Sequence, residues 1–221
     1  GTTNAFIAEE LLGKRIEKER FAAGIIDGRT CIVPKEKRLK EIVIKKGSVV
    51  DEDVIDELSP EDVFIKGANA IDPQGVAGIL LANPTGGTIG KIIGTVMARG
   101  VNFLIPVGLE KSVLYPISEA AKRIGNQEFE KSMGIPVGLM PVHGIVFTEI
   151  EALKMLGAED AFQIGAGGIG GGEGSVTLCV EGEEIDDLLE TVMKIKDEKR
   201  IKSIRENCST CERKPCLFSK N

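Results

Sequence analysis

Residues 61–110 read EDVFIKGANAIDPQGVAGILLANPTGGTIGKIIGTVMARGVNFLIPVGLE, and this stretch decides the expected fold. An apolar run at 76–81 is followed by a glycine-rich segment, and apolar residues then recur at helical spacing from 89 to 97. Arg99-Gly100 is typical of a helix end, and 101–107 is a second buried run. This order of strand, loop, helix and strand predicts a βαβ unit.

The glycine-rich turn before the helix is the first candidate site. Backbone N–H groups in the first turn of a helix lack partners, and the helix dipole adds about half a positive charge there. The turn therefore favours an anionic group, with a phosphorylated, nucleotide or carboxylated small molecule as the expected ligand. Its candidate binding residues are Gly67, Gly86, Gly87, Thr88 and Lys91. The alternative is a tight turn whose glycines serve only close helix packing.

Two segments of this stretch resemble a known signature. Residues 65–72 (IKGANAID) and 86–95 (GGTIGKIIGT) are similar to the GADAI and NKIGT segments of the phosphosugar isomerase and CoA-transferase-like superfamily. The resemblance implies an α/β fold with a largely parallel sheet and flanking helices, and an enzyme of isomerase or transferase type. In those isomerases an acidic residue of the signature takes part in proton transfer. Asn69 stands at that position, and Asp72 follows it as a second catalytic candidate.

Composition and charge limit the function classes. The chain has 221 residues, a formal charge of −6, no Trp and one Tyr, so aromatic platforms for nucleic-acid bases are not expected. Residues 194–221 hold nine Lys or Arg against four Asp or Glu, which leaves the rest of the chain at −11. That charge should repel nucleic acid. No signal peptide or membrane-length apolar run is visible, so a cytoplasmic protein is expected.

The chain beyond residue 135 has a different local pattern. A strand over 137–147, a capping box at Thr148–Glu151 and a helix to Leu156 precede two further strands and an amphipathic helix over 183–199. This order predicts a smaller α+β part of ferredoxin-like type. The expected domains are 1–135 with the glycine-loop site, 136–200 as the smaller part, and 201–221 as a basic, cysteine-containing tail.

A second glycine-rich loop spans 165–174. It fits GxGxxG, but it leads into a strand rather than a helix, which excludes the dinucleotide-binding context. Such a loop has few side chains to hold it. We expect a mobile lid that closes over the ligand turn, with Gly167 and Gly168 near the ligand; the alternative is a plain flexible connection.

The tail cysteines form a third candidate site. Cys208, Cys211 and Cys216 have the close spacing of thiolate ligands to zinc or an iron–sulfur cluster. The fourth ligand is left open between Cys31, Cys179, the single histidine His143 and a second chain. His143 is also a candidate acid or base, but its place on a predicted strand favours a structural role.

The leading hypothesis is therefore a cytoplasmic protein that binds an anionic small molecule at the glycine turn. One alternative is a protein that carries zinc or an iron–sulfur cluster through its tail. The other is an oligomeric scaffold without a small-molecule site, in which identical chains associate.

Overall fold

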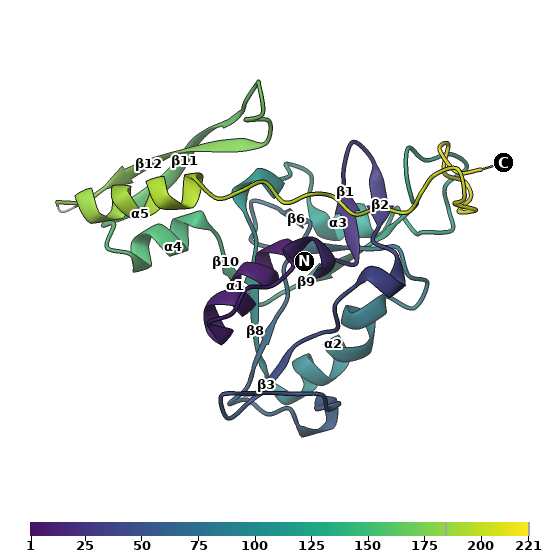
Figure 1. Ribbon diagram of the computed structural model, residues 1–221, viewed down its shortest axis with the longest axis horizontal. Helices are drawn as coiled ribbons and strands as arrows, with labels where there is room; N and C mark the ends of the chain where they lie inside the picture. The colour runs from purple at the N-terminus through teal and green to yellow at the C-terminus, as the bar shows by residue number, and fades with distance from the viewer. Residues whose placement is uncertain (184, 221) are drawn as a thin grey trace.

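The computed structural model describes residues 1–183 and 185–220 and shows a mixed α/β protein (Figure 1). Its body contains two three-stranded sheets. The parallel sheet has the order β10-β8-β5, with β5 at Val63–Ile65, β8 at Asn102–Pro106 and β10 at Ile145–Phe147. The antiparallel sheet has the order β6-β7-β9, with β6 at Ala70–Ile71, β7 at Ala77–Leu81 and β9 at Gly138–Val142.

Helix α2 (Gly87–Arg99) joins the two sheets through a shared core. Its buried Ile89 and Val96 lie in one hydrophobic cluster with Ile79 of β7 and Ile105 of β8. The helix begins after Gly86, which has a φ of 79°, and ends at Gly100, whose φ of 66° lets its N–H reach the carbonyl of Val96. The predicted strand, loop, helix and strand are all present.

The pairing of these strands differs from the predicted βαβ unit. β7 and β8 flank α2, but they belong to different sheets, and the parallel neighbours of β8 are β5 and β10. β7 instead pairs with β6 through the turn at 72–75 and with β9. The sheets are consequently small, and the parallel one is a single three-stranded sheet among the five in the described residues.

Shorter elements surround the body. Hairpin β1–β2 turns at Asp27-Gly28 as the residue pair predicts, because Gly28 adopts a φ of 66° and the Asp27 N–H bonds to the Arg29 carbonyl. The remaining elements of this part are α1 (Thr2–Leu12), η1 (Lys18–Arg20), β1 (Gly24–Ile26), β2 (Thr30–Ile32), η2 (Lys35–Lys37), β3 (Val43–Lys45), β4 (Ser48–Val50), η3 (Ile55–Glu57), η4 (Leu109–Lys111) and α3 (Ile117–Ala121).

Two expected elements are shorter than the pattern indicates. The apolar spacing after Tyr115 predicts a helix to about Lys131. The observed α3 ends at Ala121, and a turn closed by the Glu128 N–H on the Gly125 carbonyl follows it. The strand predicted over 137–147 divides into β9 and β10. Gly144 lies at the break, where an added Cβ would stand 2.5 Å from the Phe103 carbonyl oxygen.

The C-terminal elements form an arm that projects from the body (Figure 1). It consists of α4 (Glu149–Met155), the antiparallel hairpin of β11 (Asp160–Gly167) and β12 (Ser175–Glu181), and α5 (Asp186–Lys196). Leu153, Ala158, Ala161 and Leu188 form its own small core. The capping box at Thr148 is present.

The arm begins later than the boundary expected near residue 135. Both β9 and β10 lie beyond that boundary and pair with body strands. The arm itself contains only the two strands of one hairpin in its described residues, because β10 joins the body sheet rather than the hairpin. A ferredoxin-like sheet is therefore not what this part shows.

The tail after α5 runs from the arm across the body to the opposite end of the molecule (Figure 1). The described part of this tail contains neither helix nor strand. Arg205 pairs with Asp27 at 3.3 Å, and the Glu206 N–H bonds to the Ile32 carbonyl, so the tail lies along hairpin β1–β2.

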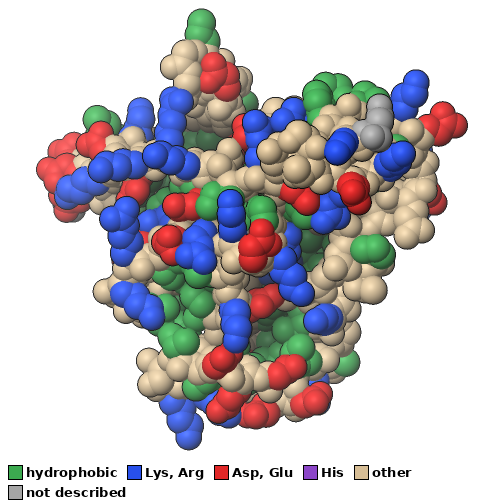
Figure 2. Space-filling model, turned by 45° about the vertical axis from the view of Figure 1, so that its right-hand side comes forward, with side chains coloured by type: hydrophobic (Ala, Val, Ile, Leu, Met, Phe, Trp, Pro, Cys, Tyr) green, Lys and Arg blue, Asp and Glu red, His purple; other side chains and the backbone are tan. Residues whose placement is uncertain are grey.

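The described residues contain no membrane-spanning helix, and on one face of the molecule their opposite charges are mixed. In the described residues, no helix combines the length and the apolar character needed to cross a bilayer. On the face shown in Figure 2, Lys and Arg side chains are interspersed with Asp and Glu rather than separated from them.

Candidate functional site

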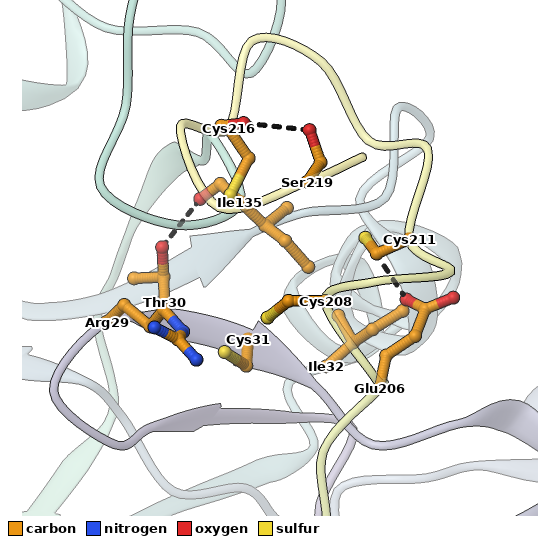
Figure 3. A pocket seen from close by; sticks show the side chains of 10 residues that line it. All are labelled: Arg29, Thr30, Cys31, Ile32, Ile135, Glu206, Cys208, Cys211, Cys216 and Ser219. Atoms are coloured by element: carbon orange, nitrogen blue, oxygen red, sulfur yellow. Dashed lines mark hydrogen bonds between the residues drawn. The ribbon is translucent and has the colours of Figure 1, made fainter. Parts of the chain in front are cut away.

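Four of the five cysteines line one small cavity between hairpin β1–β2 and the tail (Figure 3). Cys31 comes from β2, and Cys208, Cys211 and Cys216 come from the tail. The cavity measures about 20 Å³. Cys211 is buried and the other three are half-buried, so these thiols are shielded from bulk solvent.

The local sequence explains how the tail turns on itself at this place. The Asn207 carboxamide accepts a hydrogen bond from the Ser209 N–H, and the Asn207 carbonyl accepts one from Thr210. This turn brings Cys208 and Cys211 onto one short loop. The Lys220 N–H then bonds to the Cys211 carbonyl at 2.8 Å and closes the loop from the other side.

A body loop at 132–135 bridges the hairpin and the tail. The Ile135 N–H bonds to the Thr30 carbonyl at 2.9 Å, and the Thr30 hydroxyl bonds to the Ile135 carbonyl at 2.7 Å. On its other side, the Leu217 N–H bonds to the Ser132 carbonyl at 2.9 Å. β2 and the tail are thus held on the same loop, which places Cys31 opposite Cys216.

The thiol of Cys211 is turned toward a carboxylate rather than toward the other cysteines (Figure 3). Its Sγ donates to Oε2 of Glu206 at 3.8 Å, and that oxygen also accepts from Arg213 at 3.2 Å. Burial, with a further contribution from Glu206, raises the pKa of the Cys211 thiol. With the side chains in these positions, no three His, Cys, Asp or Glu residues of the described chain are placed to hold a metal ion together.

An arginine shares the cavity with the cysteines. Arg29 lines it, and its Nε is buried and has no hydrogen-bond partner. Its guanidinium carbon lies 4.3 Å from the centre of the Phe218 ring in the tail.

Among the candidates for the fourth metal ligand, Cys31 is the one that the fold brings to the tail cysteines. Cys179 lies on β12 in the arm, and His143 is exposed at the break between β9 and β10. Neither lines the cavity. Arg29 carried no motif by which the sequence alone could have selected it.

At the glycine turn, the first predicted site, the carboxylate of Glu41 from the same chain lies against the first turn of α2. Thr88, in the first turn of α2, donates its hydroxyl to Oε1 of Glu41 at 2.7 Å. This hydrogen bond lowers the pKa of Glu41, and the charges of Lys91 and Lys66 add to the effect. Gly86 and Gly87 adopt φ values of 79° and 60° and form the turn itself. Lys91 is exposed one turn further along.

Lys66 is a charged neighbour of this turn that the sequence did not single out. It directly follows β5, at the carboxyl edge of the parallel sheet. Burial lowers the pKa of Lys66, and Glu41 opposes that shift through space. The adjacent Gly67 packs closely, since an added Cβ would lie 3.2 Å from the Pro106 carbonyl oxygen.

Asp72 and Asn69 both support the backbone. The Asp72 carboxylate is 5% exposed and accepts hydrogen bonds from the N–H groups of Gln74, Val76 and Ile117, at 2.9–3.0 Å. The Asn69 carboxamide oxygen accepts from the Leu80 N–H at 3.0 Å. These contacts give both polar side chains a structural role, and their catalytic role stays a prediction.

Gly167 and Gly168 lie far from the glycine turn. They stand at the end of β11, at the tip of the projecting hairpin, whereas α2 lies in the opposite half of the view in Figure 1. Within the loop the Gly171 N–H bonds to Glu173, and Arg200 bonds to the Gly171 carbonyl. In this conformation the loop does not cover the turn as the lid hypothesis expects.

No protein-family model matches the chain, and neither the curated proteins nor the solved structures contain a significant match to it. The functional assignment therefore depends on the geometry alone.

Proposed function

We propose that this protein carries a metal ion or an iron–sulfur cluster in a centre formed by Cys31, Cys208, Cys211 and Cys216. The observation that supports the proposal best is that a cysteine of the β1–β2 hairpin shares one cavity with all three cysteines of the tail. Tetrahedral zinc and four-iron clusters both take four thiolates, so Cys31 completes the set that the tail begins.

Closure of this centre would require the thiols to turn toward one another, since no three such side chains of the described residues are placed to hold an ion as they stand. Cys31 and Cys208 lie on adjoining walls of the cavity, with Cys216 above them (Figure 3). Cys211 has to leave Glu206 and turn toward the cavity. Rotation about the Cα–Cβ bond moves a sulfur atom between staggered positions without moving the backbone. Arg213, which already bonds to Glu206, would keep the freed carboxylate paired.

Within this proposal the bound metal has a mechanical role. The described tail lacks regular structure, and its attachments to the body are scattered hydrogen bonds, the exposed Arg205–Asp27 ion pair and the stacking of Phe218 on Arg29. Exposed ion pairs each contribute only about 0–1 kcal/mol. A centre with one ligand on β2 and three on the tail would fasten the two together, because metal binding adds its free energy to the folded arrangement.

Elemental analysis and a visible spectrum of the anaerobically purified full chain test the proposal. We expect about one zinc, or about four irons with matching sulfide, for each chain. A preparation without zinc or iron that also fails to take up either one on reconstitution would refute it.

We propose, as a second function, that the turn at 86–91 binds an anionic small molecule. The Glu41 carboxylate on Thr88 supports this, because it places a negative group at the helix N-terminus where a phosphate or carboxylate is favoured. Lys66 and Lys91 supply positive charge beside it. Residues 86–95 resemble a segment of the phosphosugar isomerase superfamily. That resemblance, and the fold that it implies, are part of this second proposal only.

Thermal-shift measurements with phosphate, sugar phosphates, nucleotides and CoA esters test the second function. Glu41→Gln removes the competing charge and should enlarge the shift of any ligand that replaces it. Gly87→Asp should abolish that shift, because it introduces a fixed carboxylate at the turn. If none of these ligands shifts the melting temperature of wild type, Glu41→Gln or Gly87→Asp, the second function is refuted. A turnover assay on any ligand that binds would separate an enzyme from a binding protein.

A further inference from the structure

We infer that the four-cysteine centre takes a single soft divalent ion of the zinc type, and that Arg29 is the positioning residue that donates a hydrogen bond to its thiolates. This inference rests on the proposed function of the centre. It adds the class of the bound group and a residue outside the ligand set.

The size of the cavity favours one ion. Its volume of about 20 Å³ gives room for about one water molecule. Rotation of the four thiols toward its middle would leave a smaller space than that between the sulfur atoms. Zinc–sulfur bonds of about 2.3 Å suit such a space. A cube of four irons and four sulfides would have to displace the surrounding walls.

The chemistry of Arg29 favours a negatively charged occupant. Its Nε–H is buried without an acceptor. An unpaired buried donor is costly, and more so when it belongs to a charged group, so such an atom calls for an explanation. A divalent ion with four thiolate ligands carries excess negative charge, and its sulfur atoms accept N–H groups. Filling the cavity in this way would satisfy the orphaned donor.

The backbone places Arg29 on the correct side of the hairpin. Arg29 stands in the bend that directly precedes β2, two residues before Cys31. Arg29 and Cys31 both line the cavity (Figure 3). The stacking of the guanidinium on Phe218 holds its plane from the tail side.

A competition titration with Co²⁺ as a spectroscopic probe and Zn²⁺ as the competitor tests the inference on the full chain. Wild type should show the absorption of a four-thiolate Co²⁺ site with about one ion bound. Arg29→Gln should keep that spectrum while its affinity falls about 10–100-fold, the usual effect of losing an outer hydrogen bond to a ligand. Arg29→Lys, which keeps a cation and its donors, should recover part of the loss.

Arg15→Gln is the matched control, because Arg15 is an exposed arginine that does not line the cavity. Its affinity should stay within about threefold of wild type, because substitution of an exposed residue away from the centre changes little. Equal affinities in Arg29→Gln and wild type would overturn the role of Arg29. If Arg29→Gln does not fold, wild-type affinity in Arg15→Gln together with a loss in Arg29→Lys supports the role of Arg29, and wild-type affinity in Arg29→Lys overturns it.

The outcomes separate this inference from the proposal beneath it. A wild-type chain that binds four irons and sulfide would keep the proposed centre but overturn the single-ion assignment. A wild-type chain that binds no metal at all would refute the proposed function itself.

Discussion

Arg29 and Phe218 are stacked on each other, with the guanidinium carbon 4.3 Å from the ring centre. The contact joins hairpin β1–β2 to the C-terminal tail. Cys31 lies two residues after Arg29, and Cys216 lies two residues before Phe218. The stacked pair therefore aligns the two segments that supply the cysteines of the proposed centre.

Removal of the metal should release the tail. With the centre occupied, trypsin should cleave slowly at the basic residues of 199–214, because the thiolate ligands hold that segment against the body. After chelation the same bonds should be cut many times faster, and a time course by mass spectrometry measures the rate. Cys179→Ser, whose mutated residue lies in the arm, should behave like wild type. A cleavage rate that does not respond to the chelator would show that metal does not hold the tail.

Asp72→Asn should destabilise the body by about 2–3 kcal/mol. The carboxylate accepts three backbone N–H groups in a buried position, and the amide cannot accept all of them. Urea unfolding measures the change. Glu61→Gln, at an exposed position, should change the stability by less than about 0.5 kcal/mol. Unaltered stability in Asp72→Asn would instead free this residue for a role in a site.

Glu41→Gln should lower the stability by at most about 0.5 kcal/mol at neutral pH, because Glu41 is exposed and solvent screens its bond to Thr88. Because the folded pKa of Glu41 lies below its ordinary value of 4.5, the stabilisation is complete above that value and is lost as the pH falls through the folded pKa. Variant and wild type should therefore converge near pH 3 in chemical denaturation. Glu10→Gln, at an exposed position of α1, is the control. A difference that persists unchanged at pH 3 would contradict this assignment.

Lys66→Met should raise the stability at neutral pH by about 0.5–2 kcal/mol. Burial lowers the folded pKa of Lys66 below 10.5, so the unfolded chain binds more protons between the two values. Wild-type stability accordingly gains from this residue as the pH rises toward 10.5, and that gain should be missing in the variant. Denaturation at pH 7 and pH 10 measures both effects. A less stable variant at pH 7 would show that Lys66 has a stabilising partner.

The tip of the arm should exchange its amide hydrogens fast. Residues 168–174 connect β11 and β12 in an exposed loop with few side chains, so little burial opposes local opening. Because the tip lies away from α2, a ligand at the glycine turn should leave its exchange rate unchanged. Hydrogen exchange by mass spectrometry tests both statements. Slowed exchange on phosphate binding would restore the lid hypothesis.

Local signals in the sequence predicted the elements better than their pairing. The Asp27-Gly28 hairpin, the capping box at Thr148 and helix α2 each depend on a few adjacent residues, and all three are confirmed. The partners of β7 and β8 depend on contacts between distant segments, which periodicity does not report. The predicted βαβ unit was wrong for that reason.

The candidate site likewise contains residues that local sequence patterns indicated and residues that only long-range contacts reveal. The spacing of Cys208, Cys211 and Cys216 indicated ligands, but only the folded chain could select Cys31 as their companion. Glu41 and Arg29 had no sequence signal, because each acquires its significance from a partner far along the chain.

The metal content of Cys31→Ser, compared with that of Cys179→Ser, tests the central claim most directly. Both variants lose one half-buried cysteine, but only Cys31 lines the cavity. After identical anaerobic purification, we predict that Cys179→Ser retains the metal of wild type and that Cys31→Ser loses most of it. Equal metal content in the two variants would contradict a centre that joins the hairpin to the tail.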